Sequence, residues 1–120
     1  MARRKGLVGE ADGSEGNLEE FGRFSDPSFF VLASLAGGAK HGYALTKDVE
    51  VFAGVRLGPG TLYGALARLE ERGLIESLPA EDRRHPYRIT EAGVAVMRTY
   101  AAQLRRVSSE STARLRLLGA

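Results

Sequence analysis

The sequence of 120 residues contains no cysteine and only two histidines. Without cysteine the chain forms neither a disulfide framework nor a thiolate metal site, which fits a reducing cytoplasm. Two histidines alone give no support to a metal site. Long hydrophobic runs are also lacking, because the longest one, residues 29–38, is far shorter than the ~20 residues of a membrane-spanning helix. We therefore expect a cytoplasmic protein with no membrane partner, no metal and no cofactor.

An excess of charge of one sign is missing too. The chain has 17 lysines and arginines against 15 acidic residues, a formal net charge of +2, which is only a weak indication of nucleic-acid binding. The distribution of charge says more, because residues 94–120 hold five arginines and a single glutamate. A basic C-terminal stretch beside a balanced core suits DNA, an acidic partner or solubility alone. Hydrophobic residues make up 43%, enough for one small folded domain, to which a partner subunit would add buried surface.

The N-terminal part of the chain divides into an arm and a helix. Residues 1–24 are rich in glycine, glutamate and arginine and have little periodicity, which predicts a flexible N-terminal arm. The Asp-Pro pair at 26–27 provides a preferred N-cap followed by a proline at the first helical position. The apolar run that follows predicts a helix central to the core, and the glycines at 37–38 end it.

Apolar spacing predicts two more helices. The second runs from about 42 to 53 and has one apolar stripe, formed by Leu45, Val49 and Phe52. The third begins at Pro59 and ends at Gly73, and its buried stripe consists of Leu62, Ala65, Leu66 and Leu69.

The period then changes to that of a hairpin. Residues 74–78 and 87–89 have strand composition, and residues 79–86 connect them. Thr90 caps a final helix that reaches as far as Leu118. The predicted fold is therefore mainly α with a small β-hairpin: a winged helix-turn-helix over 25–90, followed by a long C-terminal dimerisation helix over 91–120.

In a helix-turn-helix, the N-terminal residues of the second helix lie nearest the base edges in the major groove. Here that helix starts at Pro59, and the small residues at its start let it approach a phosphate or base closely. The face opposite the leucines carries three candidate DNA-contacting residues: Thr61, Gly64 and Arg68. For Arg68 the alternative is an ion pair with Glu70 or Glu71 on its own helix.

Two tyrosines are further candidates for DNA contact. Tyr63 lies at the margin of the third helix, where its hydroxyl reaches a phosphate or, alternatively, its ring packs under the hairpin. Tyr43 opens the second helix, where the DNA backbone would cross. Its alternative is burial against Phe52 or the first helix.

Residues 79–86 are the predicted wing, with Arg83 and Arg84 adjacent near its tip. Two arginines there lie along a phosphate backbone or enter a narrow minor groove. The alternative is a solvated charge run, to which Glu81 and Asp82 also belong.

The final helix carries a heptad-like apolar seam. Its candidate dimer-interface residues are Val94, Met97, Ala101, Leu104, Leu115 and Leu118. Because the short elements before it cannot cover such a long helix, the seam predicts a homodimer. The alternative is a helix that breaks near residues 107–109 and folds back. A dimer would present two recognition helices to an inverted repeat in double-stranded DNA.

Three stretches together resemble the PadR family of bacterial transcriptional regulators: HGYALTKDVE at 41–50, LGPGTLYGALARLEERGLIES at 57–77 and RRHPYRITEAG at 83–93. The resemblance covers about residues 23–106. It implies a winged-helix dimer, commonly a repressor, of the compact subfamily with one C-terminal helix. It also implies that Tyr43, Thr61, Tyr63, Arg83 and Arg84 contact DNA.

Some relatives bind aromatic or drug-like molecules, or nucleotides, between their subunits. The resemblance therefore allows a small-molecule effector at the dimer interface, although no residue here identifies one. Two positions depart from the family pattern. Gly58 stands where a capping serine is common, and Pro86 stands where an aromatic residue is usual, so the second strand is expected to start late.

Other classes of function have less support. The glycines around the third helix lack the Lys-Ser/Thr ending of a P-loop and follow a helix rather than a strand. No serine and histidine come together with an acidic residue at a turn or strand end, so we expect that the protein is not an enzyme. The alternative from another class is a winged-helix module that binds a partner protein and not DNA.

Overall fold

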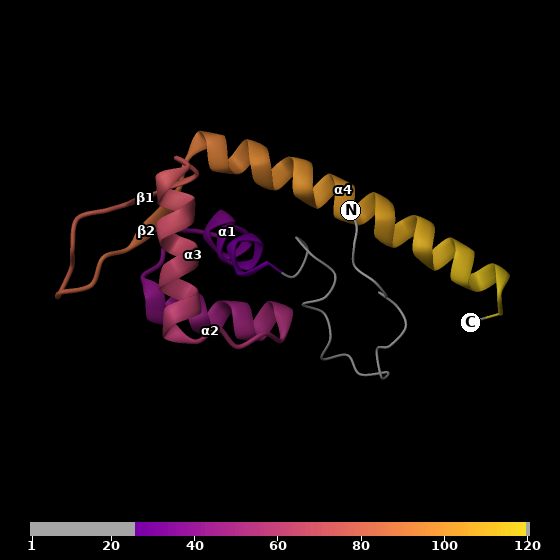
Figure 1. The fold of residues 1–120 in the computed structure, drawn as a ribbon, viewed down its shortest axis with the longest axis horizontal. Helices are drawn as coiled ribbons and strands as arrows, with labels where there is room; N and C mark the ends of the chain where they lie inside the picture. The colour runs from indigo at the N-terminus through magenta and orange to yellow at the C-terminus, as the bar shows by residue number, and fades with distance from the viewer. Residues whose placement is uncertain (1–25, 120) are drawn as a thin grey trace.

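The computed structural model describes residues 26–119 and shows four helices and one hairpin (Figure 1). The predicted arm over residues 1–24 lies outside the described residues. The elements in chain order are α1 (Pro27–Ala36), α2 (Gly42–Ala53), α3 (Pro59–Glu71), β1 (Ile75–Ser77), β2 (Tyr87–Ile89) and α4 (Glu91–Leu117). This order confirms the predicted mainly α fold with a small hairpin and a long C-terminal helix.

Helix α1 begins where the Asp-Pro pair predicts. The Asp26 carboxylate accepts a hydrogen bond from the Ser28 backbone N–H at 2.8 Å, and Pro27 occupies the first helical position. Val31, Leu32 and Leu35 on this helix are almost fully buried. The other three helices all contact α1, which therefore forms the centre of the molecule.

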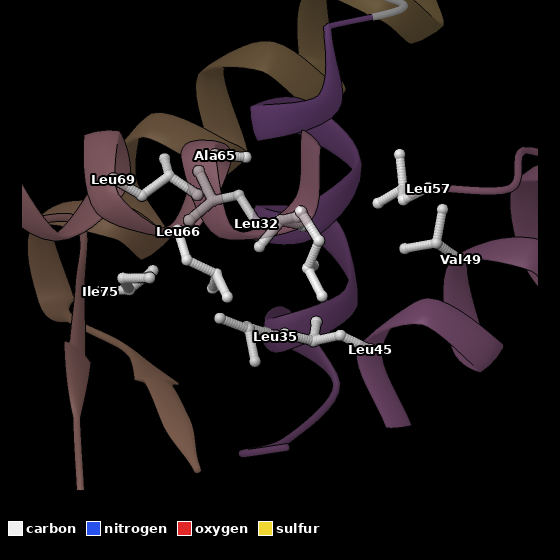
Figure 2. Close-up of a cluster of buried hydrophobic side chains, with 11 residues drawn as sticks. Leu32, Leu35, Leu45, Val49, Leu57, Ala65, Leu66, Leu69 and Ile75 are labelled. Carbon is white, nitrogen blue, oxygen red and sulfur yellow. The ribbon is translucent and has the colours of Figure 1, made fainter. Parts of the chain in front are cut away.

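A single cluster of aliphatic side chains forms the core (Figure 2). Helices α1, α2 and α3, the loop before α3, and β1 contribute to it: Val31, Leu32, Leu35, Leu45, Val49, Leu57, Leu62, Ala65, Leu66, Leu69 and Ile75. Full burial of a leucine or isoleucine side chain stabilises the fold by about 1.5–3 kcal/mol. The predicted stripe of α3 is confirmed, since all four of its members are buried.

The predicted stripe of α2 is wrong at its last member. Leu45 and Val49 are buried, but Phe52 is 50% exposed. The chain turns at Gly54, which has a φ of 70°, and Leu57 then packs at that end of the core with only 6% exposure. Leu57 thus belongs to the core cluster, and Phe52 does not.

The hairpin is short. Ile75 pairs with Ile89, Glu76 with Arg88, and Ser77 with Tyr87, so β1 has three residues and not the five predicted over 74–78. The pairing continues by one hydrogen bond, from the Leu78 N–H to the Pro86 carbonyl at 2.8 Å. The late start of the second strand after Pro86 is confirmed, because β2 begins at Tyr87. Residues 79–86 form the connection, which we call the wing.

Thr90 and Gly93 join the hairpin to α4. The Thr90 hydroxyl accepts a hydrogen bond from the Gly93 N–H at 3.1 Å and donates one to the Gly73 carbonyl at 2.7 Å. Gly93 is buried so tightly that an added Cβ would collide with the Leu74 carbonyl group. The absent side chain therefore lets the first turn of α4 pack directly on the start of the hairpin.

Helix α4 is continuous over 27 residues and ends at Leu117, one residue before the predicted limit. The alternative of a helix broken near 107–109 and folded back is wrong. At 1.5 Å per residue the helix is about 40 Å long, whereas the two shorter dimensions of the molecule are 28 and 27 Å. Its C-terminal half therefore projects beyond the body of the protein (Figure 1). Within residues 26–119 no helix is long and apolar enough to cross a membrane.

Candidate nucleic-acid interface

Helices α2 and α3 are held together by the turn between them. Gly54 ends α2 in the left-handed conformation, and its N–H donates to the Glu50 carbonyl at 3.0 Å. Across the turn, the Arg56 guanidinium contacts the Glu50 carboxylate at 3.0 Å. The buried side chain of Leu57 then fixes the point at which α3 begins. These contacts define the angle between the two helices and leave a groove of about 500 Å³ along them.

The start of α3 is open to solvent. Gly58 is the N-cap and provides no side-chain hydrogen bond, while Pro59 takes the first helical position. The first backbone N–H groups of a helix have no partner within the helix, and they attract anions. Pro59, Gly60 and Thr61 are all exposed, so this helix end is available to a phosphate or a base edge.

The exposed face of α3 carries small side chains. Thr61 is exposed and Gly64 is partly exposed, whereas the leucines occupy the opposite face. An added Cβ would meet nothing within 4 Å at Gly60, and at Gly64 only the end of the Arg68 side chain at 3.6 Å. The packing of this protein therefore does not require glycine at either position.

Both tyrosines are exposed. Tyr43, at the start of α2, is 67% exposed, so the alternative that it is buried against Phe52 or α1 is wrong. Tyr63 is 53% exposed, so its ring is not buried under the hairpin. Its hydroxyl end lies over Gly42, where an added Cβ would come within 2.5 Å of the phenol oxygen. Gly42 thus lets the Tyr63 phenol lie against the first turn of α2.

The wing ends in a tight turn. The Arg84 N–H donates to the Glu81 carbonyl at 2.9 Å, and the Glu81 N–H donates to the Arg84 carbonyl at 2.6 Å. The two residues between them, Asp82 and Arg83, have φ values of 52° and 69°. Positive φ at both central residues is the geometry of the tight hairpin turn that matches the twist of the strands. All four residues are exposed.

A cavity of about 330 Å³ lies between the wing and the starts of α2 and α3. Eight residues line it: His41, Gly42, Tyr43, Tyr63, Arg83, Arg84, His85 and Tyr87. Among these described residues there is no carboxylate, although Glu81 and Asp82 are close in sequence. Arginine side chains, phenol hydroxyls and the positive end of a helix are groups that bind phosphate oxygens. The cavity therefore suits one or more backbone phosphates.

Sequence analysis missed the part that Lys40 and His41 play here. The Lys40 backbone pairs with that of Tyr87 through hydrogen bonds of 2.9 and 3.1 Å, which ties the loop before α2 to β2. His41 occupies the N-cap position of α2 but makes no cap hydrogen bond with its side chain. Its Nε2 atom instead lies 3.4 Å from the Arg84 guanidinium. The position of His41 two residues before Tyr43 was the one sequence signal for this role.

Arg68 lies apart from the other candidates. Its guanidinium donates to the Ser28 hydroxyl at 3.4 Å and pairs with neither Glu70 nor Glu71 in the described part of the chain. It lines a second cavity, of about 370 Å³, between α1, α3 and α4. The structure therefore brings Tyr43, Tyr63 and the wing arginines together, and leaves Arg68 on the α1 side of α3.

The candidate dimer residues form two groups. Val94, Met97 and Ala101 are partly buried, and Met97 packs against the core of its own chain. Leu104, Leu115 and Leu118 are exposed, and so are Val107 and Leu117. The apolar seam of α4 thus packs against the rest of the chain in its first turns. From Leu104 onward, no other part of residues 26–119 covers it.

Comparison with known proteins adds independent findings. Residues 31–99 match the family described as the transcriptional regulator PadR-like family. An uncharacterized 37.1 kDa protein in transposon TN4556 of Streptomyces fradiae is 43% identical over 86 residues, which cover 72% of this chain and 25% of that protein. The chain thus spans about a quarter of the length of this curated relative.

Solved structures agree with the fold. A transcriptional regulator from Clostridium thermocellum has a TM-score of 0.61 and 29% identity, over 68% of this chain and 85% of that one. A PadR family transcription regulator from Clostridium difficile has a TM-score of 0.67 and 23% identity, over 74% of this chain and 97% of that one. The second likeness bears on the fold alone.

Proposed function

Because the chain belongs to the PadR-like family of transcriptional regulators, we propose that it is a homodimeric repressor that binds double-stranded DNA. The family is one of regulators and not of enzymes. The observation that carries the proposal is the cavity between the wing and the starts of α2 and α3, which arginines, histidines and tyrosines line and no carboxylate enters. This surface adjoins the open N-terminal end of α3, the part of a helix-turn-helix that lies closest to base edges.

Each candidate residue has a specific role in this proposal. Thr61 contacts a base edge from the first turn of α3, and the absent side chain of Gly64 lets the helix lie close to the groove. The hydroxyls of Tyr43 and Tyr63 bind backbone phosphates on either side of the cavity. Arg83 and Arg84 extend the contact along the neighbouring backbone or minor groove. Arg68 contacts DNA only if its guanidinium gives up the hydrogen bond to the Ser28 hydroxyl.

The proposed dimer sets the form of the operator. Two copies paired through α4 present two α3 helices related by a two-fold axis. The matching DNA is an inverted repeat with half-sites about one helical turn, roughly 34 Å, apart. A dimer bound there represses by occupying the promoter.

Selection of bound sequences from a random DNA pool, followed by affinity measurements over a range of salt, tests the proposal. We expect an inverted repeat to be selected, and its affinity to fall steeply as salt rises because phosphate counterions are released. Arg83→Ala with Arg84→Ala should weaken binding to operator and random DNA alike, and reduce the slope of log affinity against log salt by about 1.8. Thr61→Ala should instead change the preference among operator sequences.

The outcomes separate the proposal from a protein-binding module with the same fold. If no DNA is enriched and random DNA binds without salt dependence, the protein is not a DNA-binding regulator. Transcription in vitro from a promoter that overlaps the selected repeat should fall when the protein is added, and a rise would rule out repression. Repeating the selection with cell extract tests for an effector between the subunits.

A further inference from the structure

The wing carries two candidate DNA-binding arginines. Its hairpin is too short to fix its own orientation relative to the rest of the protein. Its strands have three residues each, and an isolated two-stranded hairpin is at best marginally stable in water. The direction of the wing relative to α3 must therefore be set by contacts outside the hairpin. One such contact is the backbone pairing of Tyr87 with Lys40.

A second contact joins the hairpin to α3 itself. The Ser77 hydroxyl donates a hydrogen bond to the Glu70 carboxylate at 3.0 Å. Ser77 is the last residue of β1 and pairs directly with Tyr87. Glu70 lies in the last turn of α3, on the helix that also carries Thr61. The hydrogen bond therefore connects the proposed recognition helix to the strand from which the wing departs.

The Tyr87 side chain lies close to the same point. It is partly buried against the core and lines the cavity together with Tyr63. Burial raises the pKa of the Tyr87 phenol above its ordinary value, and the Glu70 carboxylate and Tyr63 raise the pKa further. Glu70 thus acts on both paired residues of the hairpin, through a hydrogen bond to Ser77 and through its charge on Tyr87.

We propose that Glu70, Ser77 and Tyr87 form a wing bracket that fixes the angle between the wing and α3, and that Glu70 is a positioning residue for DNA recognition. The inference rests on the proposed function, since it concerns how the DNA-binding arginines are presented. Glu70 touches no DNA in this scheme. It acts by holding Arg83 and Arg84 where they reach the backbone while α3 lies in the groove.

The bracket predicts that loss of Glu70 changes the affinity for DNA in the direction opposite to the one expected from charge alone. Removal of an acidic side chain makes a protein more cationic, which alone strengthens binding to DNA. Loss of Glu70 should nevertheless weaken binding to the operator, because a wing that is free to move loses entropy when it binds. Glu71 is the matched control, because it lies next along α3, is exposed, and makes no hydrogen bond or ion pair with any residue from 26 to 119.

The first measurement compares operator affinity of the wild type with those of Glu70→Ala, Ser77→Ala and Glu71→Ala. We expect the operator affinity of Glu70→Ala and of Ser77→Ala to fall about fivefold, which is the order of magnitude expected for the loss of one side-chain hydrogen bond. Glu71→Ala should bind equally well or more tightly. If Glu70→Ala binds as tightly as Glu71→Ala, the bracket is wrong.

The second measurement needs no DNA. The chain has no cysteine, so spin labels at Ala80→Cys in the wing and Ala67→Cys on α3 are the only ones attached. Mixing labelled protein with excess unlabelled protein leaves only distances within one chain. A narrow distance distribution is expected for the wild type and Glu71→Ala, and a broad one for Glu70→Ala and Ser77→Ala. Equal widths in all four proteins would overturn the proposal.

A third measurement tests whether Glu70 acts on Tyr87 itself. The chain has four tyrosines, and ultraviolet absorbance follows their ionisation as pH rises. Tyr87→Phe should remove a transition that lies above the ordinary pH range of tyrosine ionisation, because the pKa of Tyr87 is raised. Glu70→Ala should move that transition to lower pH, whereas Glu71→Ala should leave it in place. An unmoved transition in Glu70→Ala would contradict the bracket. If the wild type binds no DNA, the proposed function fails, while the distance and titration measurements still decide whether the bracket exists.

Discussion

At the tip of the wing, Arg83 has a φ of 69° and Asp82 a φ of 52°. A residue other than glycine in this left-handed region loses about 1 kcal/mol of stability through contact of its Cβ with the backbone. Glycine, asparagine or aspartate usually occupies the central positions of such a turn. Arginine is therefore an unfavourable residue at this position of the turn. Backbone strain of this kind is expected where a side chain has a function.

Arg83→Gly should consequently separate stability from binding. We expect the free energy of unfolding to rise by up to about 1 kcal/mol, while affinity for DNA of any sequence falls about tenfold, equivalent to about 1.4 kcal/mol. Denaturant unfolding and a DNA titration at fixed salt measure the two effects. Asp82→Gly is the control, because it places glycine at the other central position of the same turn and removes an acid, so it should not weaken binding. Undiminished DNA affinity in Arg83→Gly would mean that the arginine has no part in binding.

The sequence predicted which face of its helix each candidate residue occupies, but not which residues its side chain contacts. Helical spacing predicts that Thr61 and Gly64 face away from the leucines, as they do. The same spacing says nothing of which neighbour from another helix a long side chain meets. Arg68 reaches Ser28, 40 positions earlier, and that contact depends on how α1 and α3 cross.

Among the elements, the joint between β2 and α4 makes the strictest demand on sequence. Gly93→Ala would place a methyl group against the Leu74 backbone carbonyl and 2.7 Å from Ile89 Cγ1. A backbone group cannot move aside as a flexible side chain can, so we expect a loss of about 3 kcal/mol. Thermal unfolding should show the melting temperature lowered by about 10–20 °C.

Gly64→Ala is the matched control for Gly93→Ala. It adds the same methyl group to a helix, but the only atom within 4 Å is the end of a flexible arginine. Alanine is favoured over glycine in a helix interior by about 1 kcal/mol, so the melting temperature should rise. Equal changes at both glycines would show that α4 does not pack against the hairpin as described.

The helices were predictable because their signals are local: a cap, an apolar stripe and a terminating glycine within a dozen residues. The hairpin was less predictable than the helices. Its first strand is shorter than predicted, and the backbone pairing of Lys40 with Tyr87 joins residues 47 positions apart that share no pattern. The turn at Asp82 and Arg83 lacks the Asn-Gly or Asp-Gly signal that usually predicts it. Contacts between distant segments decided each of these features.

At the scale of the whole molecule, α4 has more apolar surface than the rest of residues 26–119 covers. Its first turns pack on α1, where Phe29 and Tyr100 meet edge to face with ring centroids 5.6 Å apart. Five large apolar residues further along are exposed: Leu104, Val107, Leu115, Leu117 and Leu118. Apolar surface of this extent on one projecting helix is typical of an interface. We propose that a second copy of the chain covers it.

Leu104→Asp tests this dimer, because it places a charge in the proposed seam at the point where α4 leaves the body. Burial of an unpaired carboxylate costs several kcal/mol, so sedimentation should show a monomer. Ala102→Asp adds the same charge two residues away, at an exposed position outside the seam, and should remain dimeric. The monomer should bind a single half-site about as well as one wild-type subunit does, and lose the added affinity that two linked subunits have for an inverted repeat. If Leu104→Asp still sediments as a dimer, the subunits pair through another surface, and the spacing of half-sites predicted from α4 no longer holds.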